Sequence, residues 1–240
     1  MRAELPPRAE LIEHYRVVDR TGPRVRVNFI ASLDGAATVD GLSGGLNNAD
    51  DKMVFETLRL LTDVILVGAG TVRTEGYGGI RLSADDAAWR VRAGLAAQPP
   101  LAVVSGRLDL DPGHPLFAEA ATRPIVLTHA AAPADRRAAL AEVADVIVCG
   151  TEEVDARRVV AALAERGLPQ ILCEGGPHLF GSLVEADIVD ELCLSLSPVL
   201  EGGLAGRIAV GVTAATRAME LGHVLRAGDM LFLRYARKVS

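Results

Sequence analysis

Residues 63–72 read DVILVGAGTV, a short apolar run that leads directly into a glycine turn. Apolar runs of this length, rich in β-branched residues, are typical of strands that are buried in a sheet. Similar runs recur along the chain, at 25–31, 101–104, 124–127, 145–149, 170–174 and 191–198. Helical patterns follow several of them, beginning after a cap at Asn48 or Asp50, over 134–142, over 155–166 and near Pro177. Strands that alternate with helices predict an α/β fold of three layers, with a mostly parallel sheet between helices.

The two ends of the chain differ from this pattern. Residues 218–237 read AMELGHVLRAGDMLFLRYAR, which alternates apolar and polar residues on both sides of Ala-Gly-Asp. This alternation predicts an antiparallel C-terminal hairpin at the edge of the sheet. Residues 1–23 are rich in Pro, Arg and Glu, so we expect a flexible N-terminal arm with one helical turn near 9–15. No linker or repeat interrupts residues 24–240, which are predicted to form one domain.

The composition disfavours several classes of protein. The 240 residues carry a formal net charge of −6 and contain no Lys/Arg block, so no nucleic-acid partner is expected. No apolar run approaches the roughly 20 residues of a membrane helix. The N-terminus has no signal-peptide pattern, so we expect a cytoplasmic protein. Three cysteines lie in separate apolar runs and are expected to be buried, reduced thiols: Cys149, Cys173 and Cys193. The five histidines show no ligand spacing, so no metal is predicted.

The most informative strand end is EGGP at 174–177. Ligands of such sheets bind beyond the carboxyl ends of the strands. Here a carboxylate ends a buried strand, and two glycines let a ligand approach the backbone. The N-terminus of the following helix, near His178, offers N–H groups to a phosphate. The same residues also suit a plain strand-to-helix turn that Glu174 caps, so the pattern alone leaves both interpretations open.

Two further turns suit a nucleotide. The run GAGT at 68–71 resembles half of a dinucleotide fingerprint, although Arg73 stands where the third glycine would be. Ser105-Gly106-Arg107 follows the next strand and could hold the 2′-phosphate of an adenosine, because arginine binds phosphate through two parallel hydrogen bonds. Both segments could also be ordinary turns.

Single polar residues near these strand ends are candidates for contact with a substrate. Asp34, in the turn SLDG, could bind a substrate or supply a proton, although Asp before Gly is common in simple turns. Asn28 lies inside an apolar strand, where a buried amide needs a partner or faces a pocket. Arg59 could clamp a phosphate or remain a solvated surface residue. An irregular segment where a lid would fall contains Glu75, Tyr77 and Arg81.

The motifs also occur in an order that matches a known family. They are NFIASLDG (28–35), SG (43–44), LR (58–59), DVILVGAGTV (63–72), EGGP (174–177) and GG (202–203). This combination resembles the reductase domain of bacterial riboflavin biosynthesis, the C-terminal half of the bifunctional deaminase-reductase, over residues 24–237. More widely, the chain is similar to dihydrofolate reductase. It contains no zinc deaminase signature, and so resembles stand-alone members of the pyrimidine reductase family.

The resemblance implies a dihydrofolate-reductase-like fold, NADPH as the cofactor and a homodimer. Together with the residue chemistry, it implies that the cofactor contacts Ala31, Gly68, Gly70, Thr71, Val72, Ser105, Arg107, Glu174, Gly175, Gly176, Pro177, His178, Leu179 and Phe180. The residues expected to face the substrate are Asn28, Asp34, Arg59, Glu75, Tyr77, Arg81 and Glu174.

The implied reaction reduces the ribosylamino side chain of a pyrimidine phosphate, with 5-amino-6-ribosylaminopyrimidinedione 5′-phosphate as the expected substrate. Hydride adds to the ribose C1′, and the departing ring oxygen needs a proton, for which Asp34 or Glu75 is the expected carboxylate. The chain departs from the family pattern after Val72 and around Leu46 and Asn48. Two other functions therefore stay open, namely reduction of a pterin such as dihydrofolate and NADP binding without catalysis.

Overall fold

The structure, a computed structural model, describes residues 4–211, 213–214 and 216–238. The chain forms two compact units, each built from segments that are distant in the sequence. The first unit comprises Met1–Val18, Val25–Leu61 and Cys173–Ser240, and the second comprises Asp19–Arg24 and Thr62–Leu172. We predicted that the N-terminal arm ends at residue 23, and a boundary between the two units lies nearby, between Arg24 and Val25. That residues 24–240 form a single domain stays a prediction.

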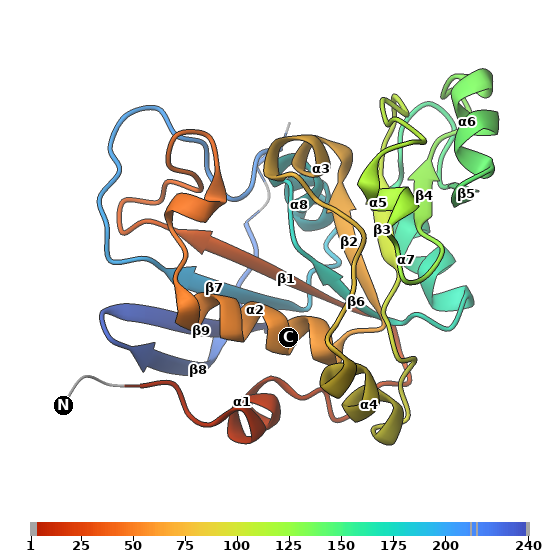
Figure 1. The fold of residues 1–240 in the computed structure, drawn as a ribbon. Helices are drawn as coiled ribbons and strands as arrows, with labels where there is room; N and C mark the ends of the chain where they lie inside the picture. The colour runs from red at the N-terminus through yellow and green to blue at the C-terminus, as the bar shows by residue number, and fades with distance from the viewer. Residues whose placement is uncertain (1–3, 212, 215, 239–240) are drawn as a thin grey trace. The chain divides into compact units, whose positions relative to one another are not determined.

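The first unit contains the mixed part of the sheet (Figure 1). Its strands are β1 (Arg24–Ala31), β7 (Glu191–Leu196), β8 (Met219–Ala227) and β9 (Met230–Arg237). Strand β1 pairs with β7 in parallel, whereas β7 pairs with β9, and β9 with β8, in antiparallel fashion. Its helices are α1 (Arg8–Tyr15), α2 (Ala49–Leu61) and α8 (Pro177–Glu185), with a short 3-10 turn at Ser43–Gly45. The C-terminal hairpin predicted from the alternating pattern is thus confirmed.

Helices cover both faces of β1 and β7. On one face, Phe29 of β1 stacks on Phe180 of α8 with the ring centroids 5.1 Å apart. Side chains alternate between the two faces of a strand, so Ile30 points to the face opposite Phe29. Ser195 of β7 is in register with Ile30 and therefore points to that same face, away from α8. There the Ser195 side chain lies near Asp51 of α2, because it lowers the pKa of the Asp51 carboxyl. The predicted layers of helix, sheet and helix are therefore present in this unit.

Helix α1 lies within the segment for which we expected a flexible arm. Its Leu11 and Tyr15 side chains are buried. Two arginines of the sheet hold the end of the helix, because Arg26 Nη2 donates to the Tyr15 carbonyl at 2.8 Å and Arg234 Nη1 donates to the His14 carbonyl at 2.9 Å. The expected single turn is thus a helix of two turns that packs on the first unit.

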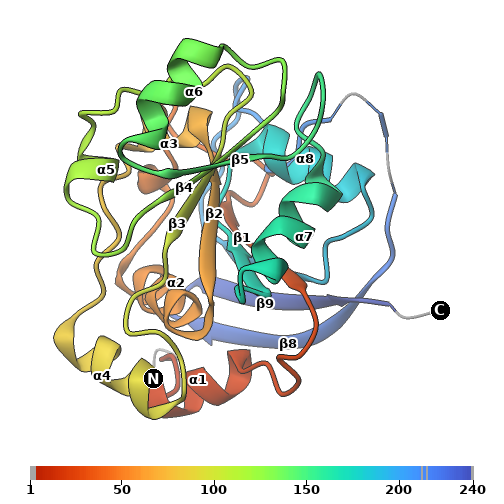
Figure 2. The same ribbon diagram turned by 90° about the vertical axis from the view of Figure 1, so that its right-hand side faces the viewer.

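The second unit carries parallel strands. These are β2 (Val64–Gly68), β3 (Leu101–Val104), β4 (Ile125–Thr128), β5 (Asp145–Val148) and β6 (Gln170–Cys173), in the spatial order β5-β4-β3-β2-β6. Its helices are α3 (Ala69–Glu75), α4 (Ala84–Arg92), α5 (Pro115–Ala118), α6 (Ala134–Ala141) and α7 (Ala156–Glu165). Figure 2 shows α7 on one side of these strands and α3 and α5 on the other. The fold class predicted from the alternating runs, α/β with a mostly parallel sheet, is confirmed.

Packing explains why the apolar runs form the second unit. Leu66, Val67, Ala102, Val103 and Val126 of β2, β3 and β4 have no exposed surface. Such strands need continuous apolar sequence because both of their faces are covered. Helices α4 and α5 lie in stretches that show no clear pattern in the sequence, and α4 begins at a Ser83 cap, whose side chain accepts a hydrogen bond from the Asp86 N–H.

Candidate functional site

An arginine–carboxylate pair lies at the end of β6. Two guanidinium nitrogens of Arg59, in α2, donate hydrogen bonds to Glu174, with Nε–Oε1 and Nη2–Oε2 distances of 2.6 Å. The Glu174 side chain is fully buried, and the Arg59 guanidinium also lies 4.2 Å from the ring centroid of Phe55. Two parallel hydrogen bonds and a cation–π contact fix the orientation of Arg59. The structure therefore brings together two of the residues that we expected at the substrate.

The glycine turn after Glu174 leads into α8 as the sequence predicted. Gly175 has φ of +127°, a conformation that favours glycine, and Gly176 is the N-cap residue of the helix. No side chain caps this terminus, and Pro177 occupies the first turn. The main-chain N–H groups of the first turn of α8 thus have no side-chain acceptor at the cap position, which is the arrangement that suits an anion.

The residues of α8 that we expected at the cofactor differ in their surroundings. His178 is exposed and Leu179 is half-buried. Phe180 is buried and stacks on Phe29. On the next turn, a Cβ added to Gly181 would lie 2.0 Å from the Val210 carbonyl oxygen. Residue 181 must therefore be glycine for the 210 segment to reach the helix.

The carboxylate of Asp34 holds a distant loop. It accepts hydrogen bonds from the main-chain N–H of Glu201 at 3.1 Å and of Gly202 at 2.7 Å, and a third from the Ser32 hydroxyl. The Ser32 hydroxyl and the two main-chain donors lower the pKa of Asp34 to about 2. A carboxylate with such a pKa stays ionised at neutral pH. This geometry argues against the proton-donor role that the sequence suggested for Asp34.

Asn28 and Ala31 lie on opposite faces of β1. Asn28 is half-buried, and within the described residues its side-chain amide makes no hydrogen bond. Ala31 is buried, and its carbonyl accepts a hydrogen bond from the Ser197 N–H at 2.9 Å. The side-chain amide of Asn28 is therefore available to form hydrogen bonds with a ligand.

The second unit holds the other expected cofactor residues. Gly68 is the N-cap of α3, and Val72 is buried in the core of the unit. A Cβ added to Gly70 would meet no atom within 4 Å, so the backbone beside Thr71 is open to close approach. At the end of β3, Ser105 is buried, whereas Arg107 is exposed.

The segment after Val72 is more ordered than a lid. Glu75 is the last residue of α3, and Gly76 ends the helix in the left-handed conformation with φ of +67°. Tyr77 packs against the apolar core of the second unit, and Arg81 is exposed. We expected Tyr77 to face a substrate. In the structure its ring packs against the core of its own unit, and this packing limits its freedom to contact a ligand.

Asp51 is a half-buried acidic residue that the sequence analysis did not single out. It lies in the first turn of α2, where Asn48 Oδ1 caps the helix by accepting a hydrogen bond from the Asp51 N–H at 2.9 Å. Burial raises the pKa of its carboxyl, and the Ser195 hydroxyl partly offsets that effect. A signal was available, because Asp51, Phe55 and Arg59 are spaced by four residues and so share one face of a helix.

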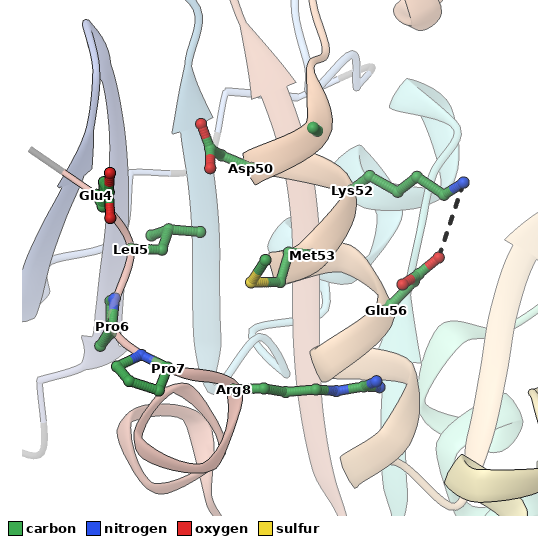
Figure 3. A pocket seen from close by; sticks show the side chains of 10 residues that line it. Glu4, Leu5, Pro6, Pro7, Arg8, Asp50, Lys52, Met53 and Glu56 are labelled. Carbon is green, nitrogen blue, oxygen red and sulfur yellow. Dashed lines mark ion pairs between the residues drawn. The ribbon is translucent and has the colours of Figure 1, made fainter. Parts of the chain in front are cut away.

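A separate cavity of about 750 Å³ lies between the N-terminal segment and α2 (Figure 3). It is lined by Glu4, Leu5, Pro6, Pro7, Arg8, Ala49, Asp50, Lys52, Met53 and Glu56. None of the residues expected from the sequence to bind a ligand belongs to this lining.

The described part of the chain gives no support for a metal site, a reactive thiol or a membrane-spanning helix. No group of three or more His, Cys, Asp or Glu side chains within it could hold a metal ion. All three cysteines are buried and unpaired, and burial raises the pKa of the Cys149 thiol to about 11, so it is a poor nucleophile. No helix among the described residues is both long and apolar enough to span a bilayer.

The fold and these strand ends define a class of α/β protein that binds ligands at the carboxyl ends of parallel strands. Within that class, the chain belongs to the RibD C-terminal domain family, whose model matches residues 23–233. It is 29% identical to the 2,5-diamino-6-ribosylamino-4(3H)-pyrimidinone 5′-phosphate reductase of Archaeoglobus fulgidus, over 75% of this chain and 83% of that protein. It is 28% identical to the reductase of the same name from Methanothermobacter thermautotrophicus, over 90% of this chain and 99% of that one.

A solved structure agrees with this assignment. A pyrimidine reductase-like protein from Corynebacterium diphtheriae superimposes with a TM-score of 0.85 at 26% identity, covering 98% of this chain and 100% of that one. The resemblance to the reductase domain of riboflavin biosynthesis that the motifs indicated is confirmed.

Proposed function

We propose that the chain is an NADPH-dependent reductase of riboflavin biosynthesis that acts on the ribosylamino side chain of a 5-aminopyrimidine phosphate. Membership of the RibD C-terminal domain family and the names of the two archaeal relatives support a reductase of this pathway. The observation that carries the proposal is the turn after β6. It joins the buried Arg59–Glu174 pair to the N-terminus of α8, which no side chain caps.

The residues present suit a dinucleotide in two respects. The open space beside Gly70 leaves the backbone at α3 free for close approach, and the α8 N-terminus offers N–H groups to a pyrophosphate. The residues proposed to hold the cofactor are 68–72, Ser105 and Arg107 of the second unit and 174–180 of the first. When bound, NADPH supplies the hydride from C4 of its nicotinamide ring.

The chain's own residues would then position the substrate and manage one proton. As the hydride reaches the ribose C1′, the bond from C1′ to the ring oxygen breaks, and that oxygen takes a proton from water. Glu75 would relay this proton, since Asp34 is fully engaged by three donors. Asn28 and Arg59 would hold the substrate, with Glu174 keeping the Arg59 guanidinium in place.

We also propose that the enzyme is a cytoplasmic homodimer. Strand β8 stands at the end of its sheet and exposes Leu221 and Val224, about half of each side chain. An exposed apolar edge strand is a common pairing surface between copies. Light scattering after gel filtration would measure the mass, and a monomer at micromolar concentration would contradict this part of the proposal.

The first experiment is a thermal shift with NADPH, NADH and ATP in separate samples. A ligand that binds only the native state raises the melting temperature by mass action. We expect a rise with NADPH that exceeds the rises with NADH and ATP, followed by oxidation of NADPH in an absorbance assay with the ribosylaminopyrimidine phosphate. Absence of a shift with either nicotinamide cofactor would overturn the proposal. Turnover of dihydrofolate alone would replace it with a pterin reductase.

A further inference from the structure

Helix α1 contacts the sheet through aromatic and polar side chains that the proposed reaction does not use. The contact is made by His14 and Tyr15 of α1 and by His223 of β8. The centroid of the His223 ring lies 5.3 Å from that of His14 and 4.9 Å from that of Tyr15, and both pairs meet edge to face. Figures 1 and 2 both show α1 beside β8. The end of α1 therefore packs against His223 at the edge of the sheet.

Two arginines and a buried carboxylate complete the cluster. Arg234 of β9 is in register with His223, and Arg26 belongs to β1. Both arginines bind Glu191 of β7, with Arg26 Nε 2.7 Å from Oε2 and Arg234 Nη2 2.6 Å from Oε1. The same two guanidinium groups donate to the carbonyls that end α1, as described above. The acceptors of the cluster are therefore already engaged by cations.

The titratable and charged groups near His223 come from five elements. They are Glu10, His14 and Tyr15 of α1, Arg26 of β1, Glu191 of β7, Glu220 and Arg226 of β8 itself, and Arg234 of β9. Glu10 and Glu220 lie on the exposed surface, whereas Glu191 is fully buried between the two arginines. The buried surroundings of His223 thus offer a cation no free carboxylate among the described residues.

The His223 ring also has a nitrogen without a partner. Its Nε2 atom is buried and makes no hydrogen bond to any residue that the structure describes. A buried, unpaired nitrogen costs free energy, and phenylalanine would make the same ring contacts without that cost. Packing alone therefore does not explain a histidine at this position. Burial, Arg234 and His14 lower the pKa of His223 to about 4, Arg26 adds to that effect, and Glu191 opposes it.

We propose that His223 is a pH-sensitive switch, whose protonation releases α1 from the sheet. A proton on Nε2 would place a positive charge beside two guanidinium groups with no acceptor for its hydrogen bond. Departure of α1 exposes the ring to water, which solvates that charge. The neutral imidazole holds the helix, so docking is complete above the ordinary histidine pKa of 6.5 and weakens as the pH falls toward 4.

Release of α1 would affect the candidate site through α2. Helix α1 packs against α2, and residues 4–8 line the cavity beside that helix. Helix α2 also carries Arg59, which binds Glu174. Undocking of α1 would therefore open the cavity and remove packing from the element that positions Arg59. The switch itself does not depend on the proposed reaction.

The test is deuterium exchange of the α1 amides in the full chain at about pH 7.5 and about pH 5.5, each rate divided by the intrinsic rate at that pH. Amides of β3 serve as the internal reference. We expect the protection of α1 relative to β3 to fall about tenfold at the lower pH, because a histidine of ordinary pKa is then mostly protonated once α1 has left. H223F keeps the aromatic ring but cannot titrate, so its α1 protection should be equal at both pH values. H14F is the matched control and should keep the fall.

Each outcome bears on the switch. Equal protection of α1 at both pH values in the wild type would overturn it, and so would an H223F protein that shows the tenfold fall. A fall that H14F abolishes and H223F keeps would assign the titration to His14 instead. Equal losses of protection in α1 and β3 would mean that acid unfolds the whole chain rather than releasing the helix. If H223F does not fold, proton NMR of the wild-type histidines decides, and a pKa of 6.5 or above for His223 would overturn the proposal.

Discussion

The Asp34 carboxylate accepts a hydrogen bond of 2.7 Å from the main-chain N–H of Gly202, a residue 168 positions further along the chain. Two main-chain bonds accompany it, from Leu33 N–H to the Val199 carbonyl and from Ala37 N–H to the Gly206 carbonyl, both 2.9 Å long. The turn after β1 and the loop after β7 are therefore held together at the carboxyl ends of two adjacent parallel strands. Asp34 supplies the one side chain seen to join them in the described residues.

We expect D34A to raise KM for the substrate or cofactor about tenfold while kcat changes much less, because the loop at 199–206 would lose its anchor. Steady-state kinetics and proteolysis of that loop would measure the effect. S32A, which removes one of the three donors, should act in the same direction and more weakly. If kcat instead fell about 100-fold at unchanged KM, Asp34 would regain the role of proton donor.

Removal of Arg59, the partner of Glu174, should lower the stability of the protein. R59M leaves a fully buried carboxylate without its two charged donors, and we expect a loss of about 3 to 5 kcal/mol in the free energy of unfolding. Urea denaturation would measure it. The double variant R59M/E174M replaces both charges with apolar groups and should recover most of that stability without activity. A single variant as stable as the wild type would show that the pair contributes little.

The buried Glu191 predicts how stability depends on pH. Burial alone would raise the pKa of its carboxyl, but Arg26 and Arg234 outweigh that effect and bring the pKa to about 2. A folded-state pKa below the unfolded value of about 4.5 adds stability that is fully present above pH 4.5. The contribution is lost as the pH falls from there toward 2.

Urea titrations of wild type and E191Q at a series of pH values would check this. The difference in unfolding free energy should be about 3 kcal/mol or more at pH 6 and should shrink steadily below about pH 4.5. E220Q makes the same change on the exposed surface of β8 and should track the wild type. A difference that stays constant down to about pH 2 would contradict the assignment of this titration to Glu191.

The close approach of Val210 to α8 predicts that one glycine cannot be replaced. A Cβ at position 181 would lie 2.0 Å from the Val210 carbonyl oxygen, so G181A must displace the segment whose N–H binds the Pro177 carbonyl. We expect a loss of about 1 to 3 kcal/mol and a lower melting temperature. G206A is the control, since a Cβ there meets no atom within 4 Å. Equal melting temperatures for the two variants would be evidence against the contact.

The inner strands β2 and β3 could be predicted from the sequence because they are buried on both faces and therefore need an unbroken apolar run, as in Val64–Gly68 and Leu101–Val104. Helix α1 could not. Its apolar residues stand among Pro, Arg and Glu, and its burial depends on arginines of the sheet that lie far away in the sequence. Tertiary contacts of this kind leave no local pattern.

The candidate site also combines features that local sequence predicts with features that depend on tertiary contacts. The turn EGGP can be recognised in the sequence as a strand-to-helix junction, because its glycines and proline suit such a turn, although the pattern leaves open whether it binds a ligand. The engagement of Asp34 depends on a loop 168 residues away, and no spacing reveals it.

The anchoring of α1 bears on how this protein should be expressed. The family match begins at residue 23, and a shortened chain that began there would lack the carbonyl acceptors that Arg26 and Arg234 use at His14 and Tyr15. It would also uncover the apolar surface on which Leu11 and Tyr15 pack. Tags are therefore better attached ahead of residue 8 through a spacer, and a protein trimmed to the family boundary for crystallisation would start with a damaged surface.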